Sequence, residues 1–178
     1  YRKYEKQGFR TPSRKVELFS TVLQELGYDP LPAYQEPPES PFSTPVLRAE
    51  YPYILITGAR RRHLFHSEGR QIPSLRKIQQ DPRVELHPVA AASHGIADKD
   101  WVRVVSPRGT ARFRAHLTGD IPPMVVSVEH GWWFPEKPGP DHGVMDSNAN
   151  RLTNAEPPYD PAFGSCQLRG LLCRIEKE

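Results

Sequence analysis

The sequence contains little cysteine, no long hydrophobic run and no strong excess of charge. Its two cysteines, Cys166 and Cys173, have a spacing that matches no zinc or iron–sulfur pattern, so neither a metal cluster nor a disulfide framework is indicated. No run of about 18 apolar residues predicts a membrane helix, and no basic-then-apolar leader opens the chain. The 24 basic and 21 acidic residues give a net charge of +3, which is too small to require nucleic acid or an anionic membrane as the partner.

The sequence also lacks the motifs of a self-sufficient enzyme. It contains no GxSxG, HExxH or Walker loop, and no GxGxxG in a strand-to-helix context. The first residue is Tyr1 rather than methionine, so we interpret the chain as an excised or processed piece. Targeting signals and catalytic residues are then expected upstream of it.

Proline, in contrast, is abundant. The chain has 20 prolines in 178 residues, about twice the usual share of about 5%, and their scattered positions exclude collagen-like and wholly disordered chains. They are dense in residues 29–52, which lack the amide donors that a helix or central strand needs. This stretch is predicted to be an extended arm on a neighbouring surface or, equally well, a flexible linker. We therefore divide the chain into an N-terminal region, 1–50, and a folded domain, 51–178.

The rest of the pattern predicts a mainly β protein. Residues 1–12 are expected to be loose, with a short strand at 15–19, a helix between Ser20 and Gly27, and a second helix at 89–94 opened by Pro88. Strands are predicted at residues 53–58, 84–87, 101–106, 110–118, 124–128 and 171–175. Five or six short strands favour a small closed or nearly closed barrel, with a sandwich as the alternative.

Four polar clusters are candidates for binding chemistry. In the first, a strand ends at Thr57-Gly58 and is followed by Arg60, His66 and Ser67, a pattern typical of close backbone approach and guanidinium donation to a phosphate or polar heterocycle. A solvated basic loop is the competing interpretation. Metal binding by histidines of this loop and nucleic-acid binding by its arginines are weaker alternatives.

The other three clusters lie in or beside the long irregular segment 129–168. They are His130-Gly131-Trp132-Trp133, the run from Asn148 to Asn150, and Gly164 with Gln167. The indoles offer stacking surface or fill the core, whereas the asparagines recognise base edges or fix turns. An irregular segment of this length is usually functional or disordered, and its tryptophans argue against disorder.

Taken in order, these residues resemble the C-terminal molybdopterin-dinucleotide-binding domain of the dimethyl sulfoxide reductase family. The segments that carry the resemblance are Gly8-Phe9, Thr11 to Glu17, Asp29 to Tyr34, Leu55 to Arg60, His87 to Val102 and Ser106 to Gly109. Arg14 and Lys99 replace glycines that are common in the family pattern. The 130–133 and 147–153 runs and Gly164-Ser165 resemble most the branch of thiosulfate and polysulfide reductases.

The resemblance implies a six-stranded double-psi β-barrel with a few short helices and an extended proline-rich arm. It also implies that the barrel covers one side of bis-molybdopterin guanine dinucleotide. The residues expected to bind this cofactor are Thr57, Gly58, Arg60, His66, Ser67, His130, Trp132, Asn148, Asn150, Gly164 and Gln167. The ligand of the molybdenum or tungsten, and any iron–sulfur cysteines, are expected upstream, so no catalytic or metal-ligating residue is assigned here.

The function expected is that of a cofactor-binding domain, inactive alone, in an enzyme that reduces oxygen or sulfur compounds. Its partners would be the remainder of the catalytic subunit and an iron–sulfur electron-transfer subunit, with no nucleic acid and no membrane insertion. The alternatives are a domain of a non-redox hydratase of the same family and a barrel that serves as an interaction or nucleic-acid-binding module. The compartment, bacterial or archaeal cytoplasm or periplasm, would depend on an upstream signal.

Overall fold

A computed structural model describes residues 1–59 and 61–178. The described residues form five short α-helices, one 3-10 helix and six strands. The helices are α1 (Lys3–Gln7), α2 (Thr21–Glu25), α3 (Pro45–Glu50), α4 (Pro73–Arg76), α5 (Pro88–Ser93) and the 3-10 helix η1 (Ala149–Arg151). The strands are β1 (Tyr53–Ala59), β2 (Arg83–Leu86), β3 (Trp101–Ser106), β4 (Gly109–Leu117), β5 (Val125–Glu129) and β6 (Leu171–Lys177).

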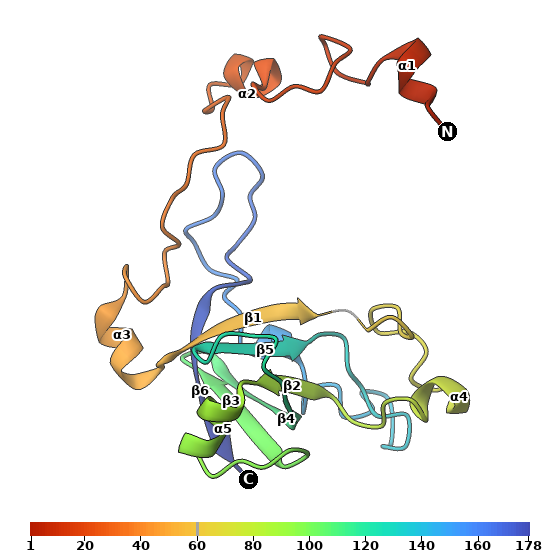
Figure 1. Ribbon diagram of the computed structural model, residues 1–178, viewed down its shortest axis with the longest axis vertical. Coiled ribbons are helices and arrows are strands. Elements are labelled where there is room, and N and C mark those ends of the chain that lie inside the picture. Colours follow the sequence, from red (N-terminus) through yellow and green to blue (C-terminus); the bar gives the residue numbers. More distant parts are fainter. Residues whose placement is uncertain (60) are drawn as a thin grey trace. The chain divides into compact units, whose positions relative to one another are not determined.

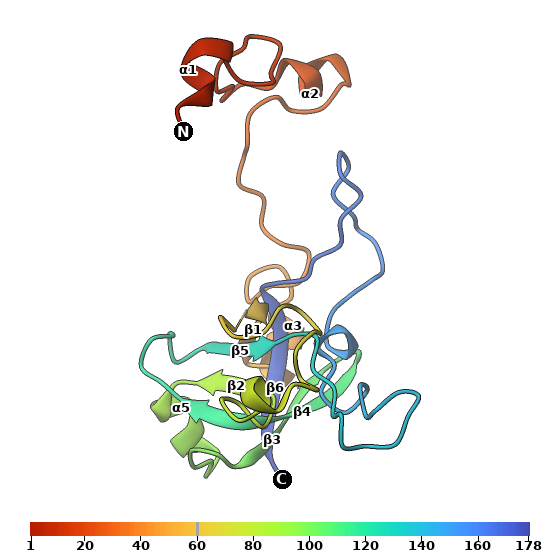
Figure 2. The same cartoon turned by 90° about the vertical axis from the view of Figure 1, so that its right-hand side faces the viewer.

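The six strands close into one barrel in the order β1-β5-β2-β4-β3-β6 (Figures 1 and 2). Two pairs are parallel, β1 with β5 and β2 with β4, and the other pairs are antiparallel. Closure leaves no free sheet edge among the described strands. The mainly β fold with a six-stranded barrel and few short helices is therefore confirmed.

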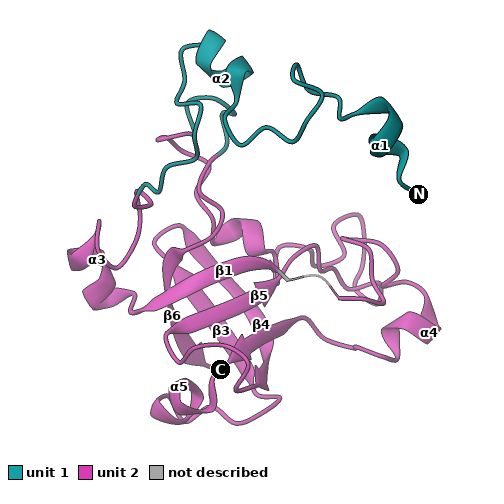
Figure 3. Ribbon diagram, turned by 45° about the horizontal axis from the view of Figure 1, so that its top comes forward, with its two compact units in different colours: residues 1–35, 160–165 teal, residues 36–159, 166–178 magenta. Residues whose placement is uncertain are grey.

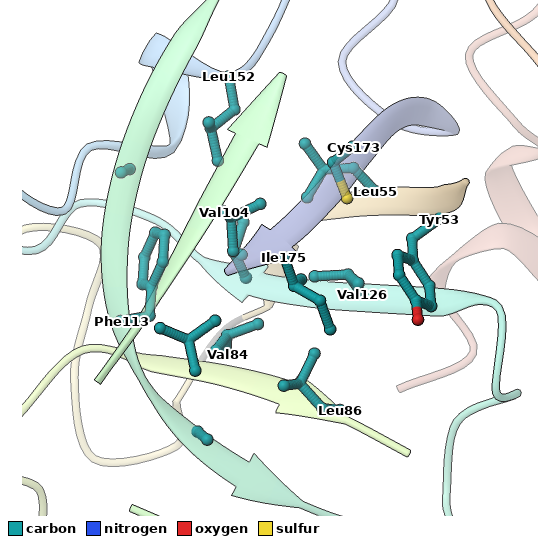
Figure 4. Close-up of a cluster of buried hydrophobic side chains, with 14 of the residues drawn as sticks. Tyr53, Leu55, Val84, Leu86, Val104, Phe113, Val126, Leu152, Cys173 and Ile175 are labelled. Atoms are coloured by element: carbon teal, nitrogen blue, oxygen red, sulfur yellow. The ribbon is translucent and has the colours of Figure 1, made fainter. Parts of the chain in front are cut away.

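The barrel is filled by the inward side chains of all six strands, and Figure 4 labels several of them together with Leu152, which follows η1. In β4, alternation places Ala111, Phe113 and Ala115 inside, each at most 3% exposed. Phe113 and Leu55 have no exposed surface. Burial of such side chains contributes about 1.5–3 kcal/mol each, which makes this interior the main source of the barrel's stability.

Most of the predicted local structure is present. Ser20 begins α2 by accepting a hydrogen bond from the backbone N–H of Leu23 at 3.2 Å, and Gly27 follows that helix with φ +81°. In α5, Pro88 is the first residue and Gly95, with φ +62°, follows the end.

Three local predictions are wrong. Residues 15–19 form no strand, because no described strand pairs with them and Leu18 is left 82% exposed. Part of the N-terminal segment expected to be loose forms α1. The proline-rich stretch contains α3, which Pro45 permits because proline is compatible with the first turn of a helix.

The chain divides into two compact units (Figure 3). The first consists of residues 1–35 and 160–165, and the second of residues 36–159 and 166–178. Residues 36–50 thus belong to the unit that contains the barrel, and the predicted division at residue 50 stays a prediction. Among the described residues, no helix combines the length and the apolar character needed to span a membrane.

Candidate functional site

The first two candidate clusters meet where the parallel strands β1 and β5 end. Ala59 is in register with Glu129, and the register shifts between Ile56 and Ala59. Gly58 lies at this irregularity with φ +87°, a conformation that side chains rarely adopt. Because both strands run in the same direction, the residues that follow them, including His66 and His130, emerge at one end of the barrel.

A hollow of about 280 Å³ opens beside this strand end. It is lined by Ile56, Thr57, Gly58, Ser127 and Arg169. The Thr57 hydroxyl donates to the carbonyl oxygen of Leu168 at 2.8 Å, so the first cluster and the segment before β6 are joined. A Cβ atom on Gly58 would lie 3.3 Å from the Arg169 guanidinium, and glycine therefore keeps the backbone accessible beside a cation.

Arg169 also lines this hollow, although it is not among the residues that the sequence predicts to bind the cofactor. Its guanidinium faces the hollow from the segment that contains the predicted Gln167. The side chain is exposed, and among the described residues it forms no ion pair. The available signal was its position two residues after Gln167 and just before the last strand.

His66 and His130 face each other across two loops. His66 Nδ1 lies 3.0 Å from His130 Nε2, so one of the two nitrogens carries the shared proton. Gly131 lets these loops approach, since a Cβ there would lie 3.0 Å from the backbone of His66. Trp133 Nε1 donates to the carbonyl oxygen of Ser67 at 2.6 Å. The structure thus brings together three predicted site residues, His66, Ser67 and His130.

Trp132, in contrast, is an interior residue. Its side chain has no exposed surface, and the guanidinium carbons of Arg70 and Arg76 lie 4.8 and 4.9 Å from its ring centroid. Contact between Trp132 and a cofactor stays a prediction. In this structure the indole packs against the buried Arg70 and the partly exposed Arg76.

The asparagine cluster forms a turn elsewhere in the barrel unit. Asn148 caps η1, and its Oδ1 accepts a hydrogen bond from the N–H of Asn150 at 2.9 Å. Ser147, which is fully buried, donates to the carbonyl oxygen of Arg112 in β4 at 2.7 Å. The Asn150 side chain is exposed. These contacts show the turn-forming role, and cofactor recognition by either asparagine stays a prediction.

Gln167 is held by the proline-rich arm. Its Oε1 accepts from the N–H of Glu39 at 3.1 Å, and its Nε2 donates to the carbonyl oxygen of Glu39 at 2.8 Å. Gly164 lies in the first compact unit, in a turn where its N–H donates to the backbone carbonyl oxygen of Asp160. Arg60 lies outside the described residues, so its predicted role stays a prediction.

A buried charge network surrounds Glu129, the residue that precedes His130 at the end of β5. The Glu129 carboxylate, 1% exposed, accepts from Arg61 Nε at 3.1 Å and from Gln79 Nε2 at 2.7 Å. Burial alone would lower the pKa of Arg61, but Glu129 and Glu85 outweigh it and the pKa is raised. Burial lowers the pKa of Arg70 despite the attraction of Glu129.

A sequence profile described as a molybdopterin dinucleotide-binding domain matches residues 53–171, which is more than half of the chain. The chain belongs to the molybdopterin dinucleotide-binding domain family. Dopamine dehydroxylase of Eggerthella lenta is 38% identical over 176 residues, which cover 97% of this chain and 17% of that protein. Trimethylamine-N-oxide reductase of Haemophilus influenzae is 34% identical over 129 residues, covering 70% of this chain and 15% of the reductase.

A solved structure, acetylene hydratase from Pelobacter acetylenicus, matches with a TM-score of 0.85 and 36% identity. The match covers 97% of this molybdopterin dinucleotide-binding domain and 24% of the hydratase chain. The chain therefore spans less than a quarter of the length of each of these three proteins. The predicted family is confirmed, while the thiosulfate and polysulfide reductase branch stays a prediction.

The strand-end residues fit a molybdopterin dinucleotide. The hollow beside Gly58 has the backbone exposure and the Arg169 cation that a phosphate requires. Thr57 and Ser127 line the same hollow. His66 is exposed, and since its Nδ1 faces His130, its Nε2 is the ring nitrogen suited to the polar edge of a pterin.

Proposed function

We propose that this domain forms the wall of a molybdopterin guanine dinucleotide site in a larger oxidoreductase subunit. The observation that carries the proposal is the hollow at the end of β1, where Gly58 exposes its backbone beside Arg169. Family membership supports it independently. The remainder of the subunit would supply the other walls, since the chain spans less than a quarter of the compared proteins.

The strand-end residues would bind the phosphate-bearing part of the cofactor. Arg169 would donate a fork of N–H groups to a phosphate, while the Thr57 hydroxyl and the Gly58 backbone would approach it closely. His66 and His130 would bind polar edges of the pterin. The remaining predicted contacts are those of Arg60, Ser67, Trp132, Asn148, Asn150, Gly164 and Gln167.

When bound, the cofactor with its molybdenum or tungsten supplies the redox chemistry. The residues of this domain bind and orient it and shield one side from water. We place the metal ligand and any iron–sulfur cluster in the remainder of the subunit. An iron–sulfur electron-transfer subunit is the further partner we propose.

We propose reduction of an oxygen- or sulfur-containing compound as the reaction of the whole enzyme. The names of the dehydroxylase and of the trimethylamine-N-oxide reductase both describe reductive chemistry. The name of the hydratase describes a non-redox reaction. The test of the full-length protein therefore has to distinguish reduction from hydration. Electron transfer from a reduced dye to N-oxides, sulfoxides or thiosulfate by the full-length protein supports the proposal. Hydration of an alkyne without turnover of any such acceptor would overturn it.

The cofactor assignment has its own test. Acid hydrolysis of the purified full-length protein should release guanosine monophosphate in proportion to its molybdenum or tungsten content. Arg169→Ala should lower that content about 10- to 100-fold, because a charge-assisted hydrogen bond contributes about 1.5–3 kcal/mol. The matched control is Arg103→Ala, which removes a half-exposed arginine of β3 that pairs with Glu176. Equal cofactor content in the two variants would contradict the role of Arg169.

A further inference from the structure

Glu129 is a buried carboxylate that joins three separate segments of the barrel unit. Its Oε2 accepts from Arg61, in the segment after β1, and its Oε1 accepts from Gln79 and from the backbone N–H of Arg83 at the start of β2. The side chain is 1% exposed. A carboxylate that is removed from water in this way requires paired charges and filled hydrogen bonds, and this one has both.

A second buried residue, Arg70, contacts the backbone of both histidines. The Arg70 guanidinium, in a residue that is 2% exposed, donates to the carbonyl oxygen of His66 at 2.6 Å and to that of His130 at 3.4 Å. Glu129 attracts this cation and Arg76 repels it. Glu129 is the last residue of β5 and immediately precedes His130 in the chain. The same buried anion therefore fixes the end of β5 and offsets the positive charge of Arg70, which donates to the backbone of both histidines.

We propose that Glu129, acting with Arg70, is a positioning residue that sets the facing geometry of His66 and His130 for cofactor binding. It acts through other residues, because its own carboxylate has almost no exposed surface. The facing of the imidazoles, with nitrogens 3.0 Å apart, is the geometry that this buried network maintains. The consequence for the cofactor rests on the proposed function, whereas the consequence for the histidine pair does not.

The test uses Glu129→Gln, which keeps the size of the side chain and removes its charge. Glu85→Gln is the matched control, because Glu85 accepts from the same Arg61 guanidinium at 3.0 Å, while its side chain is 21% exposed and lies in β2. Nitrogen NMR of histidine-labelled protein, on the full 178-residue chain, reports whether the His66–His130 hydrogen bond is present. Cofactor content is measured on the full-length enzyme.

We expect Glu129→Gln to abolish the hydrogen-bond signature of the pair and to lower cofactor content about 10-fold, which corresponds to the loss of about one hydrogen bond to the cofactor. Glu85→Gln should retain both. A folded Glu129→Gln chain that keeps the histidine signature overturns the proposal. Loss of the signature with full cofactor content supports positioning by Glu129 and instead contradicts the proposed role of the histidines in binding.

A second variant decides the matter if Glu129→Gln does not fold. Arg70→Lys keeps the positive charge but lacks the fork that reaches both carbonyl oxygens. It should lose the histidine signature while circular dichroism shows an intact barrel. Retention of the signature in folded Arg70→Lys would overturn the proposal.

Discussion

Within the barrel unit, Glu39 joins residues 36–50 to the barrel, and replacement of this glutamate gives a quantitative prediction. The Glu39 carboxylate receives two hydrogen bonds from Arg108, at 2.6 and 3.1 Å, and one from the backbone N–H of Leu172 at 2.6 Å. The Glu39 side chain is 13% exposed and the Arg108 side chain 22%. Glu39→Ala therefore leaves a mostly buried guanidinium and the amide of a fully buried residue without this acceptor.

The magnitude follows from partial burial. Breaking a fully buried ion pair costs about 3–5 kcal/mol, whereas an exposed pair contributes about 0–1 kcal/mol. The Glu39 pair lies between these limits, and we expect a loss of about 2–3 kcal/mol in the free energy of unfolding. For a chain of this length the corresponding fall in melting temperature is about 4–12 °C. Glu39→Gln should lose about half as much, because its amide oxygen still accepts from Leu172.

The assay is urea and thermal unfolding of the 178-residue chain. The control is Glu50→Ala, which removes a 65% exposed carboxylate whose partner is Arg174, and which should change stability by less than about 1 kcal/mol. A double-mutant cycle with Arg108→Ala should give a coupling of about 1–3 kcal/mol. Equal effects of the Glu39 and Glu50 variants, or zero coupling with Arg108, would refute the reasoning from burial.

Three further predictions concern single positions. A hydrogen bond from Lys177 of β6 is the largest cause that lowers the pKa of Asp100. The ionised Asp100 therefore stabilises the chain above a pH of about 4, and this stabilisation is lost as the pH falls. In urea unfolding measured at several pH values, Asp100→Asn should weaken the fall in the free energy of unfolding at acid pH. Burial raises the pKa of the Cys173 thiol. Iodoacetamide should therefore label Cys166 in the folded chain but Cys173 only after unfolding, which mass spectrometry can measure. Gly131→Ala should destabilise the chain by about 1–3 kcal/mol more than Gly95→Ala, since both have positive φ but only Gly131 faces backbone at 3.0 Å; equal losses on thermal melting would show that the close approach is unimportant.

The barrel strands could be predicted because their signals are local. The alternation in β4 and the apolar run in β1 give the inward faces directly, and the Pro88 and Gly95 pair delimits α5. The strand predicted at 15–19 failed for the opposite reason. A strand is stabilised by its neighbours, and a single alternating pentapeptide contains no information about whether a neighbour exists.

The candidate site was predictable only as separate clusters. Gly58 and the histidines carry recognisable signals, but the pairing of His66 with His130 depends on β1 and β5 being parallel neighbours, 72 residues apart at their starts. Arg169 was not among the predicted binding residues, because an arginine beside a strand is ordinary until the strand-end hollow is known. The buried position of Glu129 was equally hidden, since a glutamate at a strand end is usually exposed.

The order of strands in the barrel has a consequence for biosynthesis. β1 has only two hydrogen-bonding neighbours in the barrel, β5 and β6, and both follow it in the chain by more than 60 residues. At elongation rates of about 5–20 residues per second, β1 waits about 4–14 seconds for β5 to be synthesised. Its apolar run Tyr53-Ile54-Leu55-Ile56 stays unpaired during that time. We expect this exposed apolar segment to require protection from aggregation during synthesis, and the barrel closes only after β6 has been made.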